Sequence, residues 1–517
     1  MRISELKMLG ICLLLCIETQ GAVFNIRDFG ALGDKTGNDA AAIQAAIDKC
    51  SKAGGGTVYC PAGDYLCGAI ELKSNITLYL EQGATIWAGT DPNSFHEVQT
   101  DGVLEGDYNA HLIFAKNQQY ISIEGPGKIN GQGTADLARR AGHDRDQIPK
   151  FRIGILYLEK CRYVTVRDIK VFFSDTWTLH FKQCQTVNVD GVTIHNNYWR
   201  TNADGIDINS CKDVRVSNCS IFAGDDCICL KTVGGVPCEN IVVTNCNLET
   251  VATAAKFGTA SAGDFRDIRF SNCTIRNSTV GIGLFIKDDA TAERIAFENI
   301  SITTPDEPNQ ASEWLAAMIY PVFIDIERRT NTTPAGSVKD ITFQNIHIQS
   351  DNGILLQGMP EAPIENLTCR NITLRINKSG DYSHRTKHTG GKSNPADRRK
   401  TIYARQPSYF TIACAKGLTL DNIRVLVADE PLKKYPRRSF SIHETSDAVV
   451  RNVSGTPVQT QPLIALNNCT DVLVTDCYAP SGTQTFLEIN GDKTANISTI
   501  GNDLRNAQNG VIGKQTK

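Results

Sequence analysis

Four aspartates lie close together in the sequence, at positions where their side chains could take part in acid–base chemistry. The segment "ADGIDI" contains Asp204 and Asp207, and the segment "AGDDC" contains Asp225 and Asp226. Carboxylates held together repel each other, which raises the pKa of at least one, and the local sequence has no obvious arginine to neutralise them. Such clusters favour catalytic chemistry, although turn hydrogen bonds or a bound cation would also explain them. Asp207, placed between two isoleucines, is more consistent with a structural partner.

Apolar runs next to these aspartates recur along the chain, which predicts that one strand stacks on the next. The runs are TLHF (178–181), GIDI (205–208), CICL (227–230), AKFG (255–258) and LFIK (284–287). Ile206 and Ile228 would then be equivalent positions on neighbouring strands, which are spaced about 4.8 Å apart. Asp204 and Asp226 each precede one of these isoleucines by two residues, so we expect their carboxylates to lie side by side. Asp225 is displaced by one residue and is expected to point to a different side of the ladder.

A second repeat predicts the architecture. Triplets of alternating apolar residues, each followed by a turn residue, are spaced 23 or 27 residues apart through the centre of the chain, with starts at Val164, Val187, Val214, Ile241, Ile268 and Ile295. A period in this range indicates a solenoid, in which each unit buries its apolar face by stacking on its neighbours. A propeller blade would need about 40 or more residues. We therefore predict an all-β fold in the form of a parallel β-helix.

The cysteines follow the same period. Cys184, Cys211 and Cys238 are 27 residues apart, and other cysteines keep the same interval. A disulfide framework does not require such regularity, whereas an unpaired cysteine behaves as a small buried hydrophobic residue. We expect most of the 18 cysteines to be buried thiols.

The open end of a β-helix exposes strand edges that must be covered. The segment "NDAAAIQAAIDKCSKAGGG" predicts a capping helix, because Asn38 or Asp39 can cap it and Ile43, Ile47 and Cys50 fall on one helical face. A polar, basic stretch at about 378–407 interrupts the repeat, which then resumes. We interpret this stretch as an excursion loop within a single catalytic domain that spans residues 23–517.

Residues 1–22 have the layout of a secretory signal, with basic residues before a short apolar run. Leu15, which precedes Cys16, is not the small residue that lipid attachment usually requires, and this disfavours an anchor. We expect a secreted or periplasmic protein, without a membrane span and monomeric. The net charge of −3 gives no bias toward nucleic acid, which is not an expected partner.

Several segments together resemble glycoside hydrolase family 28, the polygalacturonase family. They are "TNADGID", "AGDDC", "SDTWTLHFKQC" and the N-terminal "FNIRDFGALGDKTGNDAAAIQAAIDKC" with "GGGTVYCPAGDY". The resemblance implies a right-handed parallel β-helix that cleaves a glycosidic bond with inversion, without a metal or other cofactor. It makes Asp225 the general acid, and Asp204 and Asp226 the groups that hold and deprotonate the attacking water. Asn202 would hydrogen-bond the sugar or orient the acid.

Two departures from the family pattern affect the expected substrate. Ala252 stands where the family has a histidine, with Lys256 nearby, and Phe285 stands where the family has an arginine, although Lys287 is kept. A guanidinium can bind a uronate carboxylate in a bidentate manner and a phenyl ring cannot. Phe285 could instead stack on a sugar face, with Lys256 and Lys287 at a uronate. The expected substrate is therefore a plant cell-wall polysaccharide or oligosaccharide of the galacturonan or rhamnogalacturonan type.

Other interpretations remain open. A polysaccharide lyase on the same scaffold would use the acids to bind Ca²⁺ and a lysine as base. A non-catalytic glycan-binding β-helix would not need Asp225. Trp177 could be a sugar platform or a buried aromatic residue, and His180 could face the cleft or the core. His384 and His388 have helical spacing but lack supporting ligands, which disfavours zinc.

Overall fold

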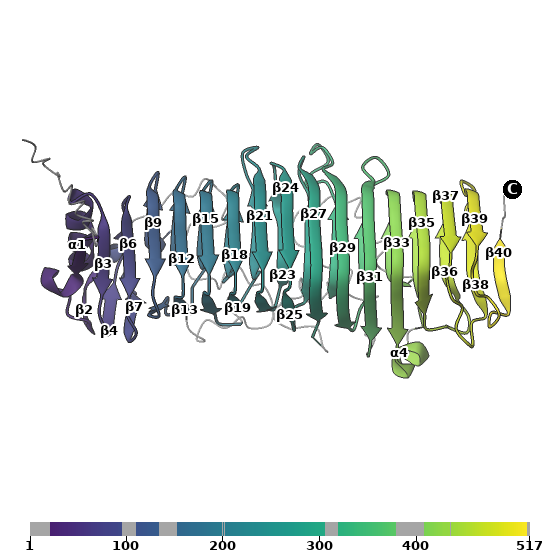
Figure 1. The fold of residues 1–517 in the computed structure, drawn as a ribbon, viewed down its shortest axis with the longest axis horizontal. Helices are drawn as coiled ribbons and strands as arrows, with labels where there is room; N and C mark the ends of the chain where they lie inside the picture. Colours follow the sequence, from purple (N-terminus) through teal and green to yellow (C-terminus); the bar gives the residue numbers. More distant parts are fainter. Residues whose placement is uncertain are drawn as a thin grey trace, which may run out of the picture.

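The computed structural model describes residues 21–95, 110–133, 152–198, 200, 202–305, 319–378, 408–434 and 436–513. These residues form an elongated stack of parallel strands, in which successive coils follow one another along the long axis from the purple N-terminal end to the yellow C-terminal end (Figure 1). The described strands are grouped in two hydrogen-bonded sheets, one of 25 strands and one of 15 strands. The predicted parallel β-helix is confirmed.

The 15-stranded sheet carries the runs that the sequence placed in one ladder. Its strands are β5 (Ile70–Glu71), β8 (Ala110–Lys116), β11 (Ile153–Glu159), β14 (Leu179–Lys182), β17 (Ile206–Asn209), β20 (Ile228–Thr232), β23 (Thr253–Ser261), β26 (Val280–Ile286), β28 (Tyr320–Ile326), β30 (Ile354–Gln357), β32 (Ser408–Ala413), β34 (Arg438–His443), β36 (Pro462–Asn467), β38 (Thr485–Asn490) and β40 (Asn509–Gly513).

The 25-stranded sheet carries the triplets. Its longer strands, most of which contain them, are β6 (Ile76–Leu80), β9 (Gln119–Glu124), β12 (Arg162–Arg167), β15 (Gln185–Asp190), β18 (Lys212–Ser217), β21 (Cys238–Thr244), β24 (Phe265–Ser271), β27 (Thr291–Thr303), β29 (Ser337–Ser350), β31 (Ile364–Ile376), β33 (Ala415–Val427), β35 (Ser446–Gly455), β37 (Thr470–Thr475) and β39 (Ala495–Ile500). The remaining strands are β1 (Val23–Asn25), β2 (Asp34–Asn38), β3 (Gly56–Cys60), β4 (Gly63–Cys67), β7 (Ala84–Ala88), β10 (Lys128–Asn130), β13 (Lys170–Phe172), β16 (Thr193–His195), β19 (Ser220–Ala223), β22 (Asn247–Thr250) and β25 (Thr274–Arg276).

The register of the triplets is the predicted one. Val164 pairs with Val187, Val187 with Val214, and Val214 with Ile241, and the same column continues through the later triplets. These residues are buried because alternate side chains of a strand point into the helix. Some coils continue this column without a clear triplet in the sequence: Ala448 lies between Leu418 and Val472, and Ile497 follows Val472.

The capping helix is α1 (Ala40–Lys52), at the purple end of the stack (Figure 1). Ile43, Ile47 and Cys50 are buried on its inner face, as predicted. Asn38 rather than Asp39 supplies the side-chain cap, because its Oδ1 accepts a hydrogen bond of 3.0 Å from the Ala40 N–H. A second short helix, α4 (Asp429–Lys434), and the short helical turns η1 (Ile26–Phe29) and η2 (Pro92–Ser94) complete the described elements.

All 16 cysteines in the described ranges are buried free thiols, in agreement with the prediction. Some predictions concern other parts of the chain. Most of the expected signal, Cys16, His384, His388 and residues 379–407 of the excursion loop lie outside the described residues. No helix in the described residues is long and apolar enough to cross a membrane.

Candidate active site

The register of two neighbouring strands brings Asp204 and Asp226 together. Ile206 of β17 pairs with Ile228 of β20, and the Gly205 N–H donates a hydrogen bond of 2.8 Å to the backbone carbonyl of Asp226. One carboxylate oxygen from each of Asp204, Asp225 and Asp226 lies within 4.8 Å of the others. The predicted proximity of Asp204 and Asp226 is confirmed.

Asp225 lies closer to this pair than strand alternation predicted. Asp225 belongs to a bend before β20, not to the strand, so the alternation of strand side chains does not apply to it. Its Oδ2 accepts a hydrogen bond of 3.1 Å from the Asn202 N–H. Asp225 is also more exposed than Asp204 and Asp226, which are each 2% exposed. It is therefore the carboxylate of the three that a large substrate reaches most easily.

Asn202 orients Asp225 through its backbone. Its φ of 56° is in the left-handed region, which asparagine tolerates better than most residues. Its side chain has a different partner, because its Oδ1 accepts a hydrogen bond of 3.1 Å from Arg152. The alternative that Asn202 orients the acid therefore fits the geometry, by way of the main chain.

The aspartates were predicted to lack an obvious neutralising arginine, but lysines neutralise part of their charge. Two lysines perform this role: the ammonium of Lys231 contacts Asp207 and lies 3.6 Å from Asp204, and that of Lys256 lies 2.6 Å from Asp226. Lys231 follows Ile228 by three residues and points outward from β20 beside Asp207 of β17. Its alternation with the buried isoleucine and leucine is the signal that places Lys231 on the same outer face as Asp207, although it does not identify the ion pair.

Burial and mutual repulsion govern ionisation in the group. Burial, together with the charges of Asp207 and Asp225, raises the pKa of Asp204 well above its ordinary value. Burial also raises the pKa of Asp226, against the opposing effect of Lys256. For Lys231, burial alone would lower the pKa, but the surrounding carboxylates raise it well above normal. The lysines are therefore protonated at neutral pH, and Asp204 holds a proton more readily than an exposed aspartate does.

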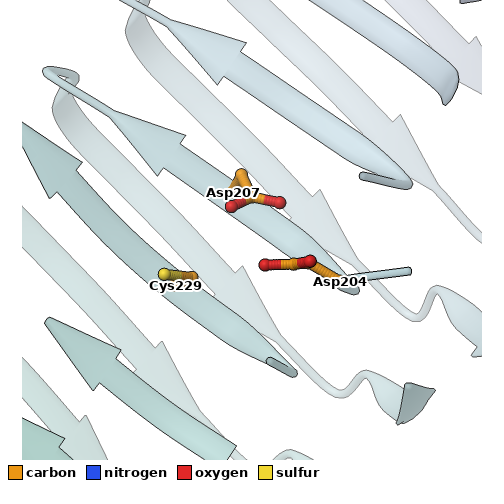
Figure 2. A group of neighbouring side chains, drawn as sticks. All are labelled: Asp204, Asp207 and Cys229. Carbon is orange, nitrogen blue, oxygen red and sulfur yellow. The ribbon is translucent and has the colours of Figure 1, made fainter. Parts of the chain in front are cut away.

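A second group, Asp204, Asp207 and Cys229, could hold a metal ion by distance alone. Asp207 and Cys229 stand on the neighbouring strands β17 and β20, and Asp204 lies just before β17 (Figure 2). The donor set does not fit a soft cation, because burial raises the pKa of the Cys229 thiol and keeps it protonated. Lys231 already supplies a positive charge to both aspartates.

Trp177 and His180 lie beside the aspartates and are enclosed. Trp177 is buried, and the Lys231 ammonium lies 3.9 Å from the centre of its ring. His180 pairs in register with Asp207 and is fully buried between Trp177 and Tyr157. Both side chains therefore support Lys231 and its neighbours rather than present an open sugar platform.

The remaining expected binding residues are Phe285, whose ring centre lies 5.8 Å from the Lys256 ammonium, and Lys287. Phe285 is 5% exposed and packs with Val280, Tyr320, Phe323 and Leu355. The burial of this ring leaves little surface for a sugar to stack on. Lys287 forms an ion pair of 2.8 Å with Glu327, and no ion pair among the described residues joins it to the three aspartates.

Ala252, at the position of the family's histidine, is buried with Val251 and packs against Tyr198. It lies in the chain between Asp226 and the lysine that contacts this aspartate, since β23 begins at Thr253 and contains Lys256. The cation beside Asp226 in this chain is therefore the ammonium of Lys256, and Ala252 contributes no charge.

Known proteins resemble the chain in both sequence and fold. A probable polygalacturonase of Vitis vinifera is 24% identical over 379 residues, which cover 68% of this chain and 73% of the relative. An exopolygalacturonase of Thermotoga maritima superposes with a TM-score of 0.59 at 21% identity. The superposition covers 69% of this chain and 87% of the Thermotoga chain. A family 28 exopolygalacturonase of Yersinia enterocolitica superposes with a TM-score of 0.57 at 17% identity. The superposition covers 92% of this chain and 78% of the Yersinia chain.

These likenesses support the predicted hand of the coil, and the fold is a right-handed parallel β-helix. The model of one family matches residues 50–389, which is more than half of the chain and includes all three aspartates. The chain belongs to the glycosyl hydrolases family 28.

Proposed function

We propose that the chain is an inverting hydrolase of glycosidic bonds in a pectic polysaccharide or oligosaccharide. The observation that carries the proposal is the meeting of three carboxylates, from adjacent coils, within 4.8 Å of one another. Asp225 protonates the glycosidic oxygen as the bond to the leaving sugar breaks. A water molecule attacks the anomeric carbon from the opposite face and loses its proton to Asp226. Asp204 helps to hold this water molecule in place.

The assignment of acid and base follows from the surroundings of each carboxylate. Asp225 is the most exposed of the three, which suits a group that must reach the leaving oxygen. Asp226 has an ammonium at 2.6 Å, which favours the ionised form that a base requires. Inverting enzymes separate the two carboxyl groups by roughly 6.5–9.5 Å so that water fits between them. The 4.8 Å limit here applies to one oxygen of each carboxylate and is not the separation of the carboxyl groups themselves.

The galacturonan and rhamnogalacturonan alternatives both remain within the proposal. The relatives of Vitis vinifera, Thermotoga maritima and Yersinia enterocolitica are named as polygalacturonases, which favours a galacturonan. The replacement of an arginine by the buried Phe285 favours a substrate with fewer uronates at that subsite. We further propose, from residues 1–22, that the enzyme acts after export.

The state of the lysines favours the hydrolase over the lyase. A lyase base must be neutral to abstract a proton from the sugar. Asp226 and other nearby carboxylates hold the pKa of Lys256 above normal, and the same effect applies to Lys231. Formation of products that absorb in the ultraviolet, and loss of activity with a chelator, would instead support the lyase.

The direct test compares the purified protein with its Asp225→Asn variant on defined galacturonan and rhamnogalacturonan oligosaccharides. Loss of a general acid lowers kcat by about 10²- to 10⁴-fold, and we expect a loss in that range with binding retained. The matched control is Asp213→Asn, which makes the same change near the start of β18 on the other sheet, at a φ of 59° that asparagine also adopts. Full activity in Asp225→Asn, or glycan binding without cleavage by the wild type, would contradict the proposal.

A further inference from the structure

Lys256 and Asp226 form an enclosed ion pair. The Lys256 ammonium lies 2.6 Å from Oδ2 of Asp226, with 9% of the lysine and 2% of the aspartate exposed. The other oxygen, Oδ1, accepts a hydrogen bond of 3.2 Å from the Thr253 N–H. Thr253 and Lys256 both belong to β23, the strand of the next coil. One neighbouring strand therefore fixes both oxygens of this carboxylate.

The other charged groups around the pair have their own partners. Lys231, on β20, contacts Asp207 and lies near Asp204. Asp225, in the same bend as Asp226, accepts a hydrogen bond from the Asn202 N–H. The two lysines thus form ion pairs with different carboxylates, and the partner of Lys256 is Asp226.

Two further groups face Lys256. The Cys229 thiol of β20 pairs in register with it, and the ring centre of Phe285 lies 5.8 Å from its ammonium. The thiol is neutral and the ring is apolar, so neither group competes with Asp226 as an anion. With nine-tenths of its surface enclosed, the lysine has little surface left for a substrate.

We propose that Lys256 is a positioning residue, which holds Asp226 ionised and correctly oriented toward the attacking water, and that it is not a substrate-binding side chain. The inference rests on the proposed function, in which Asp226 takes the proton of the water. Burial favours the neutral form of a carboxyl group, whereas a neighbouring ammonium favours the charged form. In this chain the ammonium comes from Lys256, which lies 2.6 Å from Asp226.

The test is the pH dependence of kcat/KM for Lys256→Met, which keeps the length of the side chain and removes its charge. Activity falls at low pH as the base becomes protonated. Because an opposite charge lowers the pKa of a carboxyl group by about 1–3 units, its loss should move the acidic limb upward by about that amount. We expect kcat to fall and KM to change little. Lys256→Arg, which keeps the charge, should return the acidic limb close to its wild-type position.

Two controls separate positioning from binding and from damage to the fold. Lys212→Met removes an exposed lysine that pairs with Glu239 at 3.2 Å on the other sheet, and its profile should match the wild type. Lys256→Met placed in the Asp225→Asn background should bind an oligogalacturonide as tightly as Asp225→Asn alone. Loss of that binding, or an acidic limb that does not move in an active Lys256→Met, would overturn the inference. A wild-type protein that cleaves no pectic substrate would instead refute the proposed function itself.

Discussion

His180 is the register neighbour of Asp207 on the preceding strand, and its ring is fully buried against two aromatic side chains. Its ring centre lies 4.8 Å from that of Trp177 and 5.0 Å from that of Tyr157. Neither ring nitrogen has a hydrogen-bond partner. Burial, followed by the charges of His111 and Lys231, lowers the pKa of His180 well below its ordinary value. The imidazole is therefore neutral and serves as packing beneath the Lys231 ammonium.

A pH-dependent loss of stability follows from this burial. The pKa of His180 in the folded chain lies below the unfolded value of about 6.5, so the folded state binds fewer protons and is destabilised as pH falls through 6.5. We expect His180→Phe to remove this contribution. Thermal unfolding midpoints measured from pH 7 to pH 4.5 should decline less in the variant than in the wild type. Exposed His347, changed to Phe, is the matched control, and equal declines in His180→Phe and the wild type would refute this account.

The sequence identified the aspartates but not their counter-ions. Asp204 and Asp226 could be placed because equivalent positions on adjacent coils follow from the repeat. Lys231 could not be assigned to Asp207, because its side chain reaches back to the preceding coil and rotamers are set by packing. Lys256 was expected to contact a uronate of the substrate. Its ammonium instead pairs with Asp226, and the direction of its side chain could not be read from the sequence.

At the scale of the elements, a column of asparagines marks one turn of successive coils. Most of the side-chain amides donate to the asparagine of the preceding coil; Asn345 donates to Asn299 at 2.9 Å and accepts from Asn371 at 2.9 Å. The amide of Asn272 donates instead to the Thr244 hydroxyl, and that of Asn218 to Asp190. The column comprises Asn218, Asn245, Asn272, Asn299, Asn345, Asn371, Asn422 and Asn452. All have φ near 55°, a conformation that costs other L-residues about 1–2 kcal/mol.

Asn345→Ala should therefore destabilise the fold by about 1–3 kcal/mol, because it loses two hydrogen bonds and places alanine in the left-handed region. Asn345→Gly should cost less, since glycine adopts that conformation freely. Denaturant unfolding of the two variants measures the difference. Equal stability of both variants would show that the turn conformation contributes nothing, and a wild-type-like Asn345→Ala would refute the role of the column.

The strands were more predictable than the turns that carry the chemistry. Alternation and a constant interval set the register of Val187, Val214 and Ile241, and the structure reproduces it. Ala448 could not be recognised as part of this column, because a small side chain does not mark the start of an apolar triplet clearly. The bend around Asp225 obeys no period, so its placement depends on the hydrogen bond from Asn202, which no pattern predicts.

At the scale of the whole molecule, one apolar cluster runs from Ile26 to Ile489 inside the coil. Each coil depends on its neighbours for burial, so the stack forms a long scaffold, and the bend that carries Asp225 is one local feature of it. The fold class followed from the repeat alone. The single-domain boundaries, the export signal at residues 1–22, the excursion loop and the monomeric state stay predictions.

The account depends on a water molecule activated between carboxylates of adjacent coils, and the stereochemistry of the product tests this most directly. Nuclear magnetic resonance of the first reducing ends released from a pectic oligosaccharide identifies their anomeric configuration before it equilibrates. Direct attack by water predicts the configuration opposite to that of the cleaved bond. First products that keep the original configuration would show a covalent intermediate on one of the aspartates and would contradict the account.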